Sequence, residues 1–221
     1  MATSLSEQLE ERRAGWSQRV PEARRAKMER HIKFLSETKA AQRAKQIGDI
    51  APAIILPNAH GGMFDVRTLF ANGPVVVAFY RGGWCPFCNL ELKAYQDVLP
   101  RIVAAHASLV AISPEKPDDT VSTTDKNGLG FPVLSDIGQR VGRAFGVVYD
   151  FTDELRSVYD DFGHDIPAKN GTPDDWALPM TATYVIDPKG VIIYADIGVD
   201  YRHRTDPHDV LAILERLMIA G

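Results

Sequence analysis

Cysteine is scarce in this chain of 221 residues, which contains only Cys85 and Cys88. A structural zinc site needs about four protein ligands, and the sequence offers no convincing histidine partner for the pair. His203 and His208 are the two histidines closest to each other, but they lie far along the chain and are more typical of surface residues. We therefore expect no metal site and no other cofactor.

Long apolar runs are also missing. No stretch approaches the roughly 18 consecutive apolar residues that cross a bilayer, and the opening MATSLSEQLEERRAGW is charged where a secretory signal would be apolar. The net charge of only −4 does not indicate a nucleic-acid partner. We expect a cytoplasmic protein that binds neither membranes nor nucleic acids. In a reducing compartment, a lone cysteine pair is more often redox-active than structural.

The N-terminal region differs in charge from the rest of the chain. Residues 1–45 contain 11 lysines and arginines against 6 acidic residues. Helical spacing predicts one helix before Pro21 and a second from about Glu22 to Lys45. Neither helix has a broad apolar stripe, so this region must pack either on its own domain or on a second copy in a homodimer. We expect a helical extension over residues 1–46 and one domain over residues 47–221.

From Gly48 onward, strand patterns and helix patterns alternate. The expected strands are PVVVAFY (74–80), SLVAIS (108–113), a segment near FPVLSD (131–136), and two strands within 181–198 that a Pro-Lys-Gly turn connects. Helices are expected from Pro86, near residues 137–145, and after Asp206. This alternation, which ends in a hairpin and a helix, predicts an α/β protein with a mixed central sheet and helices on both sides.

The two cysteines occur where a buried strand gives way to a helix. Pro86 suits the first helical position, so Cys85 would lie beside backbone N–H groups that have no partner within the helix, at the positive end of its dipole. Both effects lower a thiol pKa, and Arg81 would add positive charge. Cys88 follows after nearly one turn, within reach of a disulfide. We expect Cys85 to be an exposed nucleophile and Cys88 its more buried resolving partner.

Two inert buried thiols are the simplest alternative to this redox site. Core packing alone, however, does not require a tryptophan, a cysteine and a proline at the opening of a helix. The pattern W-C-P-x-C therefore favours a reversible disulfide.

From about Ile47 to Leu217 the sequence resembles the peroxiredoxin-like branch of the alkyl hydroperoxide reductase / thiol-specific antioxidant family. The matching segments are GDIAP, PVVVAFYRGGWCPFCNLEL, LVAISPE, FPVLSD and TYVIDPKGVI. The resemblance implies a thioredoxin-like fold and a thiol-dependent peroxidase. It further implies that Cys85 attacks a hydroperoxide to give a sulfenic acid, that Cys88 condenses with it, and that a thioredoxin-like or other dithiol reduces the resulting disulfide.

Three positions depart from the family pattern. A proline and a threonine usually precede the reactive cysteine where this chain has Ala78 and Gly82, and the family's arginine from a later strand aligns with Thr181. Arg81 or Arg204 could replace that arginine, and Trp84 could shape the pocket. The candidate substrate-binding residues are Arg81, Trp84 and Thr181.

Two other functions remain open at this level. The chain could exchange disulfides with other proteins as a thiol–disulfide oxidoreductase, or it could be a redox-sensing module whose helical extension binds a partner. Residues 150–178 could cover the site, with Tyr159 and Trp176 lining an apolar pocket.

Overall fold

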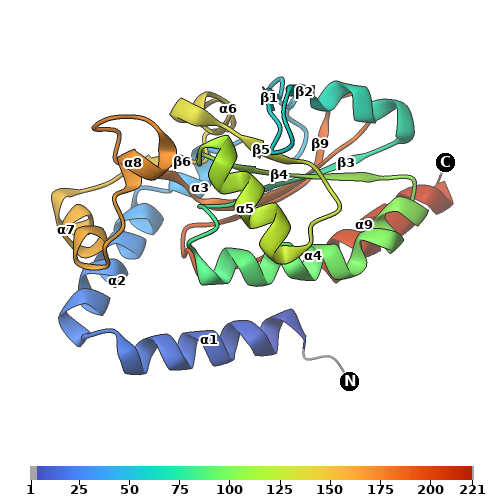
Figure 1. Ribbon diagram of the computed structural model, residues 1–221. Coiled ribbons are helices and arrows are strands. Elements are labelled where there is room, and N and C mark those ends of the chain that lie inside the picture. Colours follow the sequence, from blue (N-terminus) through green and yellow to red (C-terminus); the bar gives the residue numbers. More distant parts are fainter. Residues whose placement is uncertain (1–3, 221) are drawn as a thin grey trace.

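A five-stranded mixed sheet lies at the centre of the molecule (Figure 1). The computed structural model describes residues 4–220. The strand order is β5-β4-β3-β8-β9, with bounds β3 Val75–Phe79, β4 Ser108–Ser113, β5 Val133–Ser135, β8 Thr181–Ile186 and β9 Ile192–Gly198. The first three strands run parallel, whereas β8 is antiparallel to β3 and to β9. The α/β class and the mixed sheet are therefore confirmed.

Strand β3 explains the unbroken apolar run at its position. Successive side chains of a strand point to opposite faces of the sheet. Val76 and Ala78 enter one core cluster, whereas Val75, Val77 and Phe79 enter the other. Both faces are buried, so neither set of positions can be polar.

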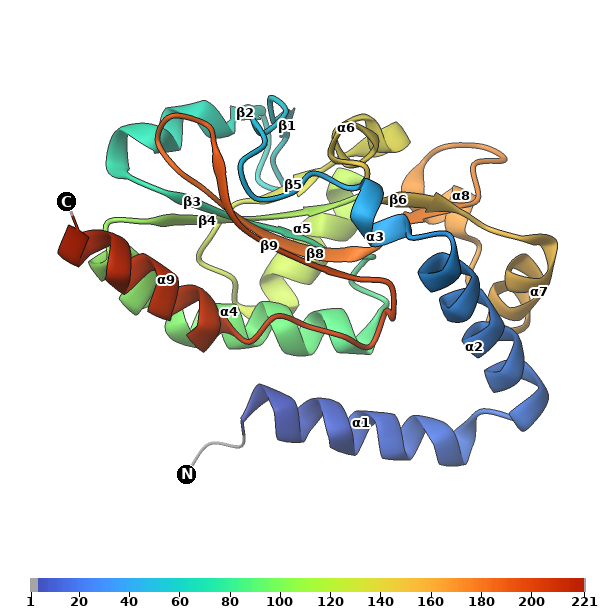
Figure 2. The same cartoon turned by 180° about the vertical axis from the view of Figure 1, so that it is seen from behind.

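Helices cover both faces of this sheet (Figures 1 and 2). One face packs on α4 (Pro86–Ala104), α5 (Pro117–Asn127) and α9 (Pro207–Ala220). The other face packs on η1 (Val66–Asn72), η2 (Ile137–Gln139), α6 (Arg140–Phe145) and the hairpin of β1 (Ile55–Pro57) and β2 (Met63–Asp65). Helix α4 continues through Pro100 without a break. None of the helices in the described part of the chain is long and apolar enough to cross a membrane.

The segment 148–179 is more ordered than the sequence indicates. It contains β6 (Val148–Asp150), α7 (Asp153–Asp161), α8 (Ile166–Asn170) and β7 (Ala177–Pro179), and its two strands pair as a separate antiparallel sheet. The strands are three residues long and far apart in sequence, so no local periodicity reveals them. The α7 helix between these two strands packs against α2 (Glu22–Glu37).

The N-terminal helices fold back on their own chain (Figure 2). Helix α1 (Leu5–Arg19) runs along α4, and α2 (Glu22–Glu37) packs against α7. The predicted single helix over 22–45 is wrong: the left-handed conformation of Lys39 (φ 54°) ends α2 and starts the short helix α3 (Ala40–Arg43). The N-terminal extension therefore packs on the domain of its own chain, which is one of the two surfaces that the sequence left open.

Candidate active site

The turn between β3 and α4 requires two glycines. Gly82 has a φ of +148°, and a Cβ there would lie 2.3 Å from Nε1 of Trp84 and 2.9 Å from the Glu115 carboxyl carbon. A Cβ on Gly83 would lie 2.0 Å from the Thr123 hydroxyl. No side chain fits at either position, which explains why Gly82 replaces the threonine of the family pattern. The tight turn delivers Cys85 to the start of α4.

Cys85 is the N-cap residue of α4 and Pro86 is the first helical residue, as the sequence predicts. The expected exposure of Cys85 is wrong, however. Cys85 is 1% exposed and Cys88 is 0% exposed. The α7 segment and the N-terminal helices form walls over the pair, and local sequence around a helix start cannot reveal such distant walls.

Ionisation of Cys85 depends on a balance between burial and nearby positive groups. Burial opposes the charged form, but the hydrogen bond from the Cys88 thiol, the charges of Arg81 and Arg204, and the Cys88 backbone N–H outweigh it. The pKa of Cys85 therefore lies well below its usual range. Burial raises the pKa of Cys88 well above its usual range, and the hydrogen bond to Cys85 and the Cys85 charge raise it further. Cys85 therefore loses its proton at a lower pH than Cys88 does.

Arg81 is one source of this positive charge. Its Nη1 lies 3.9 Å from the Cys85 sulfur, and the residue is 2% exposed. The guanidinium lies over the rings of Trp84, Tyr159 and Tyr201, at 5.0, 5.5 and 4.7 Å from their centroids. Among residues 4–220 no carboxylate forms an ion pair with it. Aromatic faces therefore hold the cation without neutralising it, so its charge acts on the thiolate.

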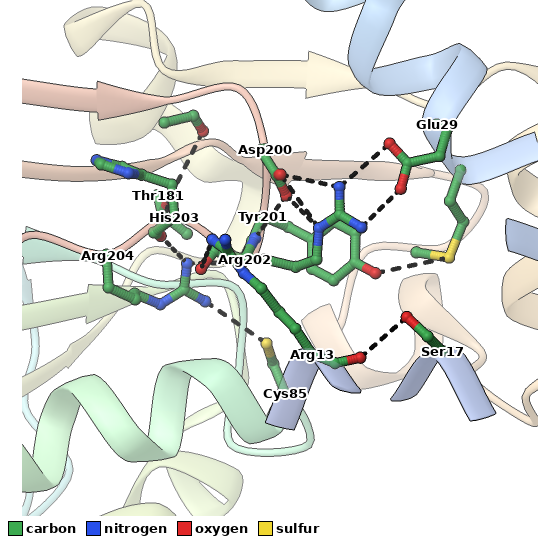
Figure 3. Close-up of polar contacts among 12 residues, drawn as sticks. Arg13, Ser17, Glu29, Cys85, Thr181, Asp200, Tyr201, Arg202, His203 and Arg204 are labelled. Carbon is green, nitrogen blue, oxygen red and sulfur yellow. Dashed lines mark hydrogen bonds and ion pairs between the residues drawn. The ribbon is translucent and has the colours of Figure 1, made fainter. Parts of the chain in front are cut away.

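Arg204 is the second source, and it comes from the loop after β9 (Figure 3). Its Nη2 lies 3.1 Å from the Cys88 sulfur and 3.7 Å from the Cys85 sulfur. Its Nη1 donates to the carbonyl oxygens of Tyr201 and His203. Thr181 donates to the same His203 carbonyl at 3.2 Å. Thr181 thus fixes the loop that carries Arg204 and does not line the cavity at Cys85.

Glu91 lies on the same face of α4 as Cys88, beside Arg204. The Nε of Arg204 lies 3.0 Å from Oε2 of Glu91, and both side chains are almost fully buried. The two charges attract each other without a well-aligned hydrogen bond. Burial raises the pKa of Glu91 to about 7, against the opposing effect of Arg204. Sequence reasoning missed this residue, although its spacing of three from Cys88 places it on the inner face of the helix.

The raised pKa of Glu91 predicts a pH-dependent stability. The folded protein binds a proton at Glu91 that the unfolded chain releases, so the stability contributed by this group is complete below pH 4.5 and is lost as pH rises to about 7. Glu91→Gln mimics the protonated form. We expect the unfolding free energy of the wild type to fall relative to this variant across that window, by a few kcal/mol at most. Urea unfolding at a series of pH values measures the difference, and parallel profiles would contradict the assignment.

Glu115 is a second buried carboxyl group near the turn. It accepts a hydrogen bond of 2.7 Å from the Gly83 N–H. Burial raises its pKa to about 7, while that hydrogen bond lowers it. Glu115 therefore holds the glycine turn in place.

The cavity at Cys85 contains several of the predicted residues. Arg81, Trp84 and Tyr159 line it, whereas Trp176 packs on Phe151 and does not. Trp16 and Val20 of the N-terminal region and Tyr201 of the loop after β9 also line it, and no local sequence pattern indicates this.

A sheet of this order, with a C-x-x-C pair opening the helix after its central strand, defines a thioredoxin-fold protein with a paired-thiol site. Residues 47–195 match the AhpC/TSA family. The chain belongs to this family.

Curated relatives agree with this assignment, and a solved structure shares the fold. The chain is 32% identical over 100 residues to peroxiredoxin Bcp of Escherichia coli, covering 45% of this chain and 64% of the relative. It is 29% identical over 145 residues to the chloroplastic peroxiredoxin Q of Populus jackii, and this match covers 66% of this chain and 57% of the relative. The matches thus span about three fifths of these relatives. The crystal structure of peroxidoxin BcpB from Mycobacterium tuberculosis shares the fold, with a TM-score of 0.62 at 22% identity over 78% of this chain and 97% of that one.

Proposed function

We propose that this protein is a thiol-dependent peroxidase, in which Cys85 is the peroxidatic residue and Cys88 the resolving residue. The observation that carries the proposal is the position of the Cys85 sulfur at a cavity of about 280 Å³ and within 4 Å of two arginines, which lower the pKa of this thiol. A hydroperoxide can enter that space, whereas a folded protein disulfide cannot reach sulfurs that are 1% and 0% exposed without a rearrangement. Burial therefore favours the peroxidase over the protein disulfide exchanger.

In the first step the Cys85 thiolate attacks the terminal peroxide oxygen. The S–O bond forms while the O–O bond breaks, and the leaving alkoxide takes up a proton to become an alcohol. Negative charge moves from sulfur to the leaving oxygen during this step. Arg81 and Arg204, both within 4 Å of the Cys85 sulfur, would stabilise that charge. Trp84 would form one wall of the site, and Thr181 would act through the loop that it anchors.

In the second step the Cys88 sulfur attacks the sulfur of the Cys85 sulfenic acid. The S–S bond forms, the S–O bond breaks, and the hydroxyl leaves as water with the proton of Cys88. A thioredoxin-like or other dithiol then reduces the disulfide by exchange and becomes a disulfide itself. Unlike the attack on a small hydroperoxide, this step needs a rearrangement that exposes the sulfurs, because both are buried. Because this cycle consumes a dithiol, we place it in a reducing compartment such as the cytoplasm. We also propose that residues 1–46 are an extension to the domain formed by residues 47–221.

Stoichiometric oxidation tests this proposal. Reduced protein mixed with one equivalent of hydrogen peroxide should lose two hydrogen atoms by intact mass, and peptide mapping should join Cys85 to Cys88. The reaction should be much faster than that of a free thiol at the same pH. Oxidation as slow as a free thiol, alongside rapid reduction of a protein disulfide substrate, would favour the exchanger instead.

A further inference from the structure

The cavity at Cys85 has walls from four separate parts of the chain. The β3–α4 turn provides Arg81, Trp84 and Phe87. The α7 segment provides Tyr159, and the loop after β9 provides Tyr201. The last wall comes from Trp16, Val20 and Met28, which precede the family match at residues 47–195. The N-terminal helices therefore complete a cavity that the family domain leaves open.

We propose that this cavity binds the aromatic substituent of a bulky aryl hydroperoxide, and that Trp16 is a specificity-determining residue for it. The inference rests on the proposed peroxidase function and adds the substrate class. It assigns to the N-terminal helices the role of a substrate wall.

The size of the cavity supports a ring-bearing substrate. An engineered apolar cavity of roughly 150 Å³ is enough to bind benzene, and the cavity here measures about 280 Å³. A substituted phenyl ring therefore fits. Hydrogen peroxide, with only two heavy atoms, would leave most of the apolar wall without contacts.

The wall consists of aromatic rings that meet edge to face. The ring centroid of Tyr201 lies 6.4 Å from that of Trp16 and 5.8 Å from that of Phe87, with interplanar angles of 67° and 81°. The ring centroids of Trp84 and Tyr159 lie 5.9 Å apart, and the ring planes meet at 87°. Such arrangements favour a further aromatic ring, because each exposed ring face can accept an edge. The same rings offer a straight alkyl chain only non-directional contact.

Arg81 provides a polar group at the sulfur, because its Nη1 lies 3.9 Å from Sγ of Cys85. The Nε and Nη2 atoms of Arg81 have no well-aligned hydrogen-bond partner among residues 4–220, although the Tyr149 hydroxyl lies nearby. His164 also lines the cavity, and burial lowers the pKa of its imidazole. A substrate would therefore place its peroxide group at Cys85 and Arg81 and its ring against the aromatic wall.

A polar network centred on Arg202 joins α1 and α2 to the loop after β9 (Figure 3). Arg202 forms ion pairs with Glu29 of α2 at 2.6 Å and with Asp200 at 2.8 Å. Its guanidinium lies 5.8 Å from the Trp16 ring and 5.5 Å from the Tyr201 ring. In addition, Arg13 of α1 donates to the Arg202 carbonyl at 3.1 Å. The extension is thus fixed to the loop that also carries Arg204, so Trp16 has a defined position beside the cavity.

Rates with three peroxides test this inference. Cumene hydroperoxide carries a phenyl ring, tert-butyl hydroperoxide carries a bulky group without a ring, and hydrogen peroxide carries neither. We expect Trp16→Ala to lower kcat/KM for cumene hydroperoxide by about tenfold, the effect of one lost aromatic contact. The rate with hydrogen peroxide should change less than about twofold. Trp16→Phe should retain the preference. Phe34→Ala, on an exposed side chain of α2 outside the cavity, is the matched control.

Val20→Trp provides a second test that does not loosen the wall. Because the larger side chain fills the cavity, kcat/KM for cumene hydroperoxide should fall, whereas kcat/KM for hydrogen peroxide should change little. Equal changes for all three peroxides in both variants, or equal wild-type rates for cumene and tert-butyl hydroperoxide, would overturn the inference.

Binding separates this inference from the proposed function. Cys85→Ser protein should bind 2-phenyl-2-propanol, the alcohol formed from cumene hydroperoxide, with a change in tryptophan fluorescence that Trp16→Ala weakens. Such binding without any peroxidase rate would retain the aromatic site and reject the peroxidase. No binding would reject the aromatic site, whatever the rate with hydrogen peroxide.

Discussion

Cys85→Ser should reduce the rate of peroxide reduction to background, a loss of more than about a thousandfold, because a serine hydroxyl does not ionise at neutral pH. Cys88 cannot replace it, since burial holds the pKa of that thiol well above its usual range. Cys88→Ser should behave differently. A serine hydroxyl can still donate to the Cys85 sulfur, so the first oxidation should proceed and stop at the sulfenic acid.

Rapid mixing with hydrogen peroxide, followed by intact mass, distinguishes the two variants. Cys88→Ser should gain one oxygen atom and then react with a cyclic dione that captures sulfenic acids. Cys85→Ser should do neither. The double variant is the control for oxidation elsewhere. Fast oxidation of Cys85→Ser, or loss of the first step in Cys88→Ser, would reverse the roles of the two sulfurs.

Arg204→Met should lower the rate of the first step by about 10² to 10³, the usual effect of losing one group that stabilises transition-state charge. The same change should raise the pKa of Cys85, because the Arg204 charge is one of the groups that lower it. Methionine fills much of the vacated volume without a charge. Stopped-flow rates and thiolate titration measure the two effects.

The loss of Arg204 also leaves its ion-pair partner Glu91 without a counter-charge, which affects stability. A double variant separates this effect from the effect on the rate. Removing one partner of a buried ion pair destabilises a protein by about 3–5 kcal/mol when the other charge remains. The pKa of Glu91 is already about 7 and would rise further without Arg204, so Glu91 would become neutral and the loss should be smaller. The double variant Arg204→Met/Glu91→Gln should regain the stability that Arg204→Met loses. Its rate should stay as low as that of Arg204→Met. A wild-type rate in the double variant would remove Arg204 from the mechanism.

Local sequence was sufficient to predict the elements that position the cysteines. The central strand β3 has a continuous apolar run from Val75 to Phe79, and the helix after it begins at Pro86 where the proline pattern indicates. The C-x-x-C spacing likewise predicted that the two sulfurs lie close together, and both contact the same Arg204 guanidinium. These features depend on neighbours within about one helical turn, so the chain reveals them without knowledge of the fold.

Features that depend on distant contacts could not be predicted in this way. Arg204 is 119 residues from Cys85, and only the turn after β9 brings it to the sulfur. The burial of Cys85 depends on the α7 segment and on Trp16, which lies before the family match. In the sequence nothing distinguishes Glu91 from other helical glutamates, because its environment depends on Arg204, which packs beside it only in the folded chain.

The pKa of Cys85 is the quantity on which the account depends most directly. Titration of the Cys88→Ser protein leaves one thiol, and its thiolate absorbance or its rate of alkylation gives the midpoint. The account predicts a midpoint well below the value of about 8.5 of an unperturbed cysteine, because two arginines and the start of α4 surround the sulfur. A midpoint at or above that value would contradict it, since burial would then outweigh every group that favours the thiolate.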